Sequence, residues 1–149
     1  MQNPKLNSDD AFKTLLIIWF ALVMSQVIFV VMIYAVKPEM LHFDLVRPAL
    51  GDTPIVVAAF AVLTLANLAM SFIMPKRFLT QSVDQQDIGL VQTAMIIGCA
   101  LCESVSLFGV LLAFAFNYKY FFIFSAIGIL GTLLHFPRRG DVHAASFMT

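Results

Sequence analysis

The sequence has little charge for a protein that lives in water. Charged residues make up 12% of its 149 positions, against about 25% in an ordinary soluble domain. Hydrophobic residues make up 60%, more than a soluble core of this size can bury. The formal net charge is zero, which does not supply the basic patch that nucleic-acid binding needs. This composition excludes a free cytosolic enzyme, a disordered tail and a nucleic-acid-binding protein, and it indicates an integral membrane protein.

Cysteine is also scarce. The sequence has two cysteines, which are too few for a disulfide framework. Cys99 and Cys102 are spaced C-x-x-C inside an apolar run, where no base or cation lowers a thiol pKa. We interpret them as packing residues, with a redox or metal site as the alternative. No catalytic triad, metal-ligand cluster or phosphate loop is visible, so we expect neither an enzyme nor a metal site. A cleavable signal peptide is not expected either, because the first apolar run is too long.

What the sequence does have is four long apolar runs, each near the 20 residues that a helix needs to cross a bilayer. They predict an all-α, polytopic integral membrane protein that forms a single membrane domain over residues 1–149. The four transmembrane helices are expected at about 15–36, 55–74, 88–116 and 120–136. Pro75 directly follows the second run and predicts the end of that helix.

The distribution of Lys and Arg predicts the orientation of these spans. Six of these residues lie at the N-terminus, in the loop after the second run and in the C-terminal tail: Lys5, Lys13, Lys76, Arg77, Arg138 and Arg139. Three lie on the opposite side: Lys37, Arg47 and Lys119. Because cytoplasmic loops retain positive charge, both termini are expected in the cytoplasm. We expect the protein in the cytoplasmic (inner) membrane, surrounded by lipid.

One acidic residue, Glu103, lies near the centre of the third run, whereas the other eight lie in predicted loops or tails. An ionised carboxylate at that depth costs about 3 kcal/mol on insertion scales. Protonation avoids this cost, so the group can exist as a neutral acid and release its proton where water or a cation is available. Glu103 is therefore either an ion-carrying carboxyl or a protonated side chain that holds helices together by a hydrogen bond.

Other polar and small side chains lie at a similar depth. Polar groups that could support the carboxyl, or form ordinary interhelical hydrogen bonds, are Ser25, Gln26, Thr64, Asn67, Ser104 and Ser106. Small residues at Gly98, Cys102 and Gly109 form a stripe along the third helix that lets another helix approach closely. The sequence leaves open whether that second helix belongs to the same chain or to a second copy.

Residues 90–114, which read LVQTAMIIGCALCESVSLFGVLLAF, resemble the carboxylate-bearing helix of the proteolipid c subunits of rotary ATP synthases. That family shows a small-residue run, an Ala-Leu pair two residues before a midplane Glu, and then aliphatic residues, Gly and Ala-Phe or Ala-Leu. The resemblance implies that Glu103 is the ion-carrying carboxylate, with Ser104 and Ser106 as supporting neighbours. In the family, this helix is the second of a hairpin whose polar loop faces the cytoplasm.

Two functions follow as hypotheses. The first is an ion-translocating, proteolipid-like membrane subunit in which Glu103 reversibly carries a proton or sodium ion, within an oligomer of the chain or beside other membrane subunits. The alternative is a non-catalytic structural or accessory subunit of a larger membrane complex. A haem- or chlorophyll-binding subunit is a third, weaker hypothesis, which would depend on His135 and His42. These two residues fall on opposite sides of the predicted membrane, so no cofactor is expected.

Overall fold

The chain folds almost entirely into helices. The structure is a computed structural model that describes residues 8–41, 50 and 52–146. Its elements are α1 (Ser8–Val36), a 3₁₀ turn η1 (Pro38–Leu41), α2 (Pro54–Gln85), α3 (Ile88–Phe116), α4 (Phe121–Leu134) and α5 (Arg139–Ala144). No strand occurs in these described ranges. The prediction of an all-α protein is confirmed.

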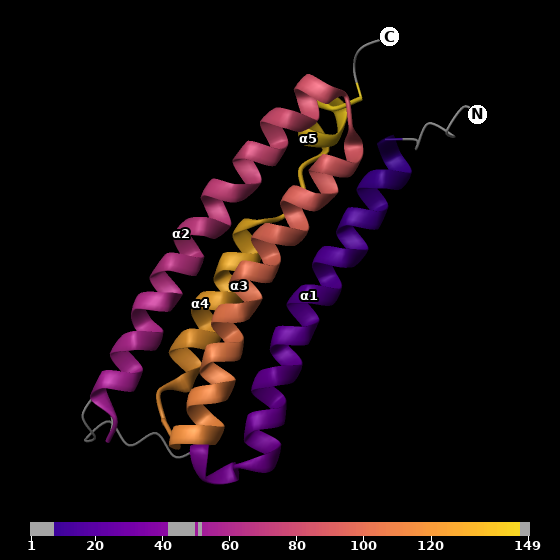
Figure 1. Ribbon diagram of the computed structural model, residues 1–149. Helices are drawn as coiled ribbons and strands as arrows, with labels where there is room; N and C mark the ends of the chain where they lie inside the picture. Colours follow the sequence, from indigo (N-terminus) through magenta and orange to yellow (C-terminus); the bar gives the residue numbers. More distant parts are fainter. Residues whose placement is uncertain (1–7, 42–49, 51, 147–149) are drawn as a thin grey trace.

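Helix α3 is the central element, and α1, α2 and α4 all pack against it (Figure 1). The α2–α3 connection turns at Gln86, and the connection that follows α3 turns at Asn117. Both residues are left-handed, with φ of 54° and 49°. Such residues end helices by redirecting the chain. The Asp87 carboxylate accepts a hydrogen bond from the Gly89 N–H at 2.7 Å and caps the start of α3. The first turn of α1 and the short helix α5 lie at the same end of the bundle (Figure 1).

Three helices, α1, α2 and α3, are long and apolar enough to cross a membrane. Their outer surfaces are apolar, and Ile17 and Ile55 expose 70% and 85% of their surface. Lipid accommodates such a surface, whereas water would not. Helix α4 is also apolar but has only 14 residues, so it is about 21 Å long. It is therefore shorter than the hydrocarbon core of roughly 30 Å.

The helices α1 and α2 extend beyond the apolar runs that predicted them. Helix α1 begins at Ser8, where Asp9 and Asp10 in its first turn stabilise the positive end of the helix dipole. Helix α2 continues through Pro75 to Gln85, so the prediction that it ends at Pro75 is wrong. Proline has no N–H for the carbonyl four residues earlier, and that carbonyl, on Ser71, lies 2.7 Å from a ring nitrogen of His135 instead. The helix thus tolerates its proline through a tertiary contact.

The small-residue stripe of α3 packs within this chain, because its three predicted residues are buried and face α4 or the residue that follows it. A Cβ atom on Gly109 would lie 2.9 Å from the backbone oxygen of Phe121. A Cβ atom on Gly131 of α4 would lie 2.7 Å from the Cys102 Sγ. Gly98 adjoins the ring of His135. The stripe therefore allows the close approach of α3 and α4.

Candidate functional site

Glu103 lies on the face of α3 that contacts α1, and it is only partly buried. The Ser25 hydroxyl of α1 donates a hydrogen bond to the Glu103 Oε1 at 2.6 Å. Both residues come from the middle of long apolar helices. The carboxyl group therefore lies at a helix seam between two membrane-spanning candidates, with one specific partner across the seam.

The Ser25 hydroxyl has a second acceptor within reach, the Leu22 carbonyl of its own helix at 2.9 Å. A hydroxyl has one proton and can donate to only one of these two oxygens, while its own oxygen remains free to accept. When Glu103 is ionised, Ser25 donates to the carboxylate. When Glu103 is protonated, its O–H can donate to Ser25 while Ser25 donates to Leu22. The pair therefore satisfies its hydrogen bonds in both protonation states of the acid.

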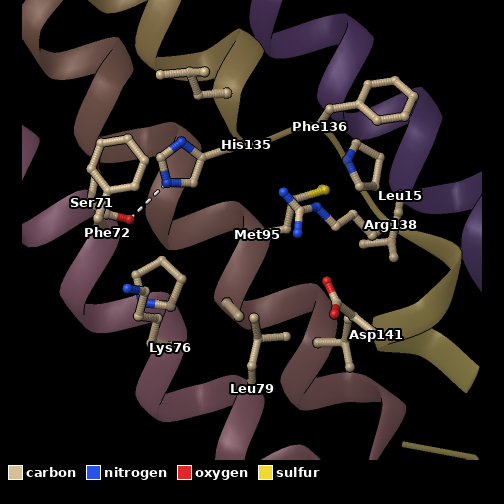
Figure 2. A pocket seen from close by; sticks show the side chains of 15 residues that line it. Leu15, Ser71, Phe72, Lys76, Leu79, Met95, His135, Phe136, Arg138 and Asp141 are labelled. Atoms are coloured by element: carbon tan, nitrogen blue, oxygen red, sulfur yellow. Dashed lines mark hydrogen bonds between the residues drawn. The ribbon is translucent and has the colours of Figure 1, made fainter. Parts of the chain in front are cut away.

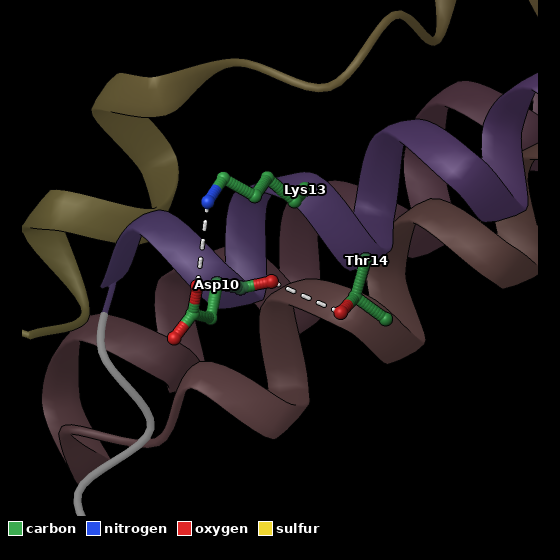
Figure 3. A network of polar contacts seen from close by, with 3 residues as sticks. All are labelled: Asp10, Lys13 and Thr14. Carbon is green, nitrogen blue, oxygen red and sulfur yellow. Dashed lines mark hydrogen bonds and ion pairs between the residues drawn. The ribbon is translucent and has the colours of Figure 1, made fainter.

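No cation neutralises Glu103 within the part of the chain that the structure describes. The only ion pair found there joins Lys13 and Asp10 at 3.6 Å, and both side chains are exposed at the start of α1 (Figure 3). The Thr14 hydroxyl in the same view donates to the Asp10 carbonyl at 2.9 Å. If Glu103 were ionised, the hydrogen bond from Ser25 would be the one contact found in the described residues that offsets the free energy of desolvating the carboxylate.

Two of the predicted supporting residues, Gln26 and Ser106, bind each other rather than Glu103. The Ser106 hydroxyl donates to the Gln26 Oε1 at 2.7 Å, and the Gln26 Nε2 donates to the Thr132 Oγ1 at 2.6 Å. The Trp19 indole N–H donates to the Thr132 carbonyl at 2.9 Å. This network connects α1, α3 and α4, and three of its members, Gln26, Ser106 and Thr132, are fully buried. Each member of this network has a hydrogen-bond partner within it.

Three more of the six predicted polar residues, Asn67, Ser104 and Thr64, also form no hydrogen bond with Glu103 among the described residues. The Asn67 Nδ2 donates to the Ser104 Oγ at 2.8 Å across the α2–α3 interface, and Ser104 donates to the Leu101 carbonyl at 2.7 Å. The Thr64 hydroxyl is buried without a hydrogen-bond partner among the described residues. Ser25 is one of the six polar residues that the sequence predicts at a similar depth to Glu103, and it is the one that contacts the Glu103 side chain. Depth along a helix can be read from the sequence, but the direction in which the side chain points cannot.

His135 lies just beyond the end of α4, against α2 (Figure 2). Its Nδ1 lies 2.7 Å from the Gly131 carbonyl, and its Nε2 lies 2.7 Å from the Ser71 carbonyl. The Cys102 Sγ lies 3.9 Å from Nδ1. The ring borders a pocket of about 270 Å³ whose charged lining residues are Lys76, Arg138 and Asp141. Figure 2 shows Lys76 below the ring, Arg138 to its right and Asp141 to its lower right.

The remaining candidate ligands do not form a centre in the described residues. Both cysteines are buried free thiols, and no group of three or more His, Cys, Asp or Glu is placed there to hold a metal ion. The two ring nitrogens of His135 are both occupied by carbonyl oxygens, so the ring does not offer a free ligand atom. His42, Lys5 and Arg47 lie outside the described residues.

Comparison of the chain with protein-family models, with curated proteins and with solved structures finds no match.

Proposed function

We propose that this chain is a proteolipid-like membrane subunit in which Glu103 binds and releases a proton within the bilayer. One observation carries the proposal: the Ser25 hydroxyl lies within hydrogen-bond distance of two acceptors, the carboxyl group at 2.6 Å and the Leu22 carbonyl at 2.9 Å. A purely structural carboxyl needs a hydrogen-bond pattern for one protonation state. This site has a pattern for each state, and only a rotation of one hydroxyl separates them.

In this proposal four helices cross the membrane, with both termini in the cytoplasm of a cell whose inner membrane holds the protein. The asymmetry of six against three Lys and Arg residues supports this orientation. The short helix α4, together with Tyr120 and residues 135–136, forms the fourth span of 17 residues. A bilayer that thins locally around the protein accommodates so short a span at a modest cost.

The seam between α1 and α3 is the route by which Glu103 meets a donor or acceptor of protons. The side chain is partly exposed at this seam, so a polar group of another subunit or of a second copy can reach it from the lipid side. The small-residue stripe of α3 is already occupied by α4 of the same chain. The proposal therefore assigns the exchange of protons to the α1–α3 seam and not to the stripe.

Labelling with a hydrophobic carbodiimide tests the proposal, because this reagent modifies protonated carboxyl groups in membranes. Glu103 should be labelled, the rate should fall as pH rises, and Glu103→Gln should abolish the modification. Ser25→Ala should shift the pH at which the rate is halved, because it removes the donor to the ionised form. Ser104→Ala is the matched control, since that serine bonds to Asn67 and not to Glu103, and it should leave the pH profile unchanged. Absence of labelling at every pH would refute the proposal.

A non-catalytic accessory subunit is the second candidate, and the central position of α3 favours it. The helix that bears Glu103 contacts α1, α2 and α4 of its own chain, so little of its surface remains for a ring of identical copies. Such a subunit should co-purify with other membrane proteins at a fixed stoichiometry. Glu103→Gln should then leave the ion flux of that complex unchanged, whereas a loss of flux would favour the proton-carrying function.

A further inference from the structure

Two backbone carbonyls near the end of α4 lack their usual helical donors. The Ser71 carbonyl of α2 would normally accept from the residue four positions later, but that residue is Pro75, which has no N–H. The Gly131 carbonyl of α4 does not receive the backbone N–H of His135, which bonds to the Thr132 carbonyl at 3.1 Å instead. A buried carbonyl without a donor is costly, so each of these groups requires another hydrogen bond.

The imidazole ring of His135 supplies a donor position for both carbonyls. Its Nδ1 lies 2.7 Å from the Gly131 oxygen and its Nε2 lies 2.7 Å from the Ser71 oxygen. A carbonyl oxygen can only accept, so a hydrogen bond at each position needs an N–H on each nitrogen. Neutral imidazole has one N–H, whereas imidazolium has two. The neutral ring would thus turn a nitrogen lone pair toward one of the two oxygens.

We propose that His135 is a proton-binding site, and that its imidazolium form joins the end of α4 to α2 beside Pro75. We call the two hydrogen bonds that the imidazolium donates, to the Gly131 and Ser71 carbonyls, the clasp. The clasp does not depend on the proposed role of Glu103, which faces α1 on another side of α3. In this arrangement one proton links two helices that share few other contacts. Release of the proton removes one of the two hydrogen bonds and weakens the junction.

The surroundings of the ring are compatible with reversible protonation. The pocket beside it is lined by the exposed residues Lys76 and Arg138 and by the half-buried Asp141, and it gives the ring access to water. The groups that face the site are Lys76 from α2, the Cys102 thiol from α3, and Arg138 and Asp141 from the C-terminal segment; the residue that lines the pocket from α1, Leu15, does not titrate. Lys76 and Arg138 oppose a charge on the ring and Asp141 favours it. The two carbonyls, which lie closest, favour the protonated form.

The packing of the ring shows that its position is specified. Gly98 of α3 leaves room for the ring, because a Cβ atom there would lie 2.5 Å from the His135 Cδ2. The Phe72 ring lies 4.8 Å from the imidazole ring, centroid to centroid, with an interplanar angle of 31°. The face of an aromatic ring attracts positive charge. Both neighbours therefore hold the imidazole ring between the two carbonyls.

Nitrogen NMR of the full chain, labelled with ¹⁵N-histidine in lipid bilayers, tests the protonation state directly. His135→Gln identifies the resonances, and a pH series from about 5 to about 11 extends well above the range in which unperturbed histidines titrate. We expect two protonated ring nitrogens at the low end of the series and the loss of one proton as pH rises. A ring that keeps one unprotonated nitrogen at every pH would overturn the proposal. Cys102→Ala should leave the spectrum unchanged; a change of tautomer would show instead a neutral ring that accepts from the thiol.

A stability series tests the clasp itself. The apparent unfolding midpoint of the wild-type chain in bilayers should fall by roughly 3–6 °C as the ring loses its proton. Pro75→Ala returns an N–H to the Ser71 carbonyl and should reduce this fall, as should His135→Gln. Pro54→Ala, at the first turn of the same helix, is the matched control and should keep the wild-type pH dependence. If Pro75→Ala and Pro54→Ala respond alike to pH, the clasp does not exist, and this result is independent of carbodiimide labelling at Glu103.

Discussion

Replacement of Gln26 tests how far polar contacts hold this bundle together. Its side chain is fully buried and joins α1 to both α3 and α4, through the Ser106 hydroxyl at 2.7 Å and the Thr132 hydroxyl at 2.6 Å. Gln26→Leu retains nearly the same volume but removes both interhelical hydrogen bonds. Gln26→Ala removes the bonds and also leaves a cavity. The two variants therefore separate hydrogen bonding from packing at one position.

The expected magnitudes follow from the two bonds. Interhelical hydrogen bonds in membranes contribute about 0.6 kcal/mol on average and up to about 1.7 kcal/mol. Two such bonds predict that Gln26→Leu lowers the free energy of unfolding by about 1–3 kcal/mol. The hydroxyl of Thr132 still donates to the Gly128 carbonyl at 3.0 Å, so this group is not left without an acceptor. Gln26→Ala should cost more, because large-to-small changes in a packed core add about 2–5 kcal/mol.

Reversible unfolding in mixed micelles, followed by the fluorescence of Trp19, measures both values. Trp19 is the only tryptophan of the chain, and its indole N–H bonds to the Thr132 carbonyl beside the substituted residue. Met24→Leu on the exposed face of α1 is the control and should be neutral. A Gln26→Leu variant that is as stable as the wild type would contradict the role of the two hydrogen bonds, and one that is as unstable as Gln26→Ala would contradict the separate role of packing.

Three further predictions concern α4, the end of α3 and the turn between them. Gly128→Ala should lower the free energy of unfolding by about 1–3 kcal/mol, because the new Cβ would lie 2.7 Å from a backbone oxygen of α3. Gly140→Ala is the control and should be neutral in the same assay, because the space around Gly140 is open. Lys37→Met should speed amide hydrogen exchange at the end of α3, because the Lys37 Nζ donates to two carbonyls in the last turn of α3 at 3.0 and 3.3 Å. The free energy of unfolding should fall by about 0.3–1 kcal/mol. Burial, and secondarily the neighbouring Tyr120, raises the pKa of Tyr118 above its ordinary value of 10.0, so the fold favours the neutral phenol. The contribution of Tyr118 to stability should be constant below pH 10.0 and fall as pH rises further, and Tyr118→Phe should flatten that alkaline fall in a stability series.

The helical architecture is predictable because it depends on quantities that a single sequence contains. Apolar length predicts four membrane helices, of which α1, α2 and α3 are long and apolar enough to cross a membrane, and the bounds of α3 agree with the expected range of 88–116. The Asp87 cap and the left-handed Asn117 mark the two ends of α3 through local backbone chemistry. These features need no knowledge of the neighbouring helices.

The course of α2 and the partner of Glu103 depend on neighbouring helices and could not be predicted in this way. Helices usually end before a proline, so the sequence predicts an end at Pro75. The Ser71 carbonyl, which Pro75 leaves without a donor, is instead bound by His135, which lies 64 positions later in the chain. Likewise, Ser25 and Gln26 are adjacent in the sequence and have the same depth. Only the rotation of α1 decides that Ser25 meets the carboxyl group and Gln26 meets α4.

The hydrogen-bond patterns divide the buried polar groups of the bundle into two kinds. The network of Gln26, Ser106 and Thr132 satisfies its members in one arrangement, and none of these side chains changes charge. In lipid, where apolar burial does not drive helices together, such networks specify which helix faces meet. Glu103 and His135 differ, because in our proposals a single proton rearranges or removes a hydrogen bond between helices at each of them. In the two proposals made above, a proton-dependent cycle acts through the α1–α3 seam at Glu103 or the α2–α4 junction at His135.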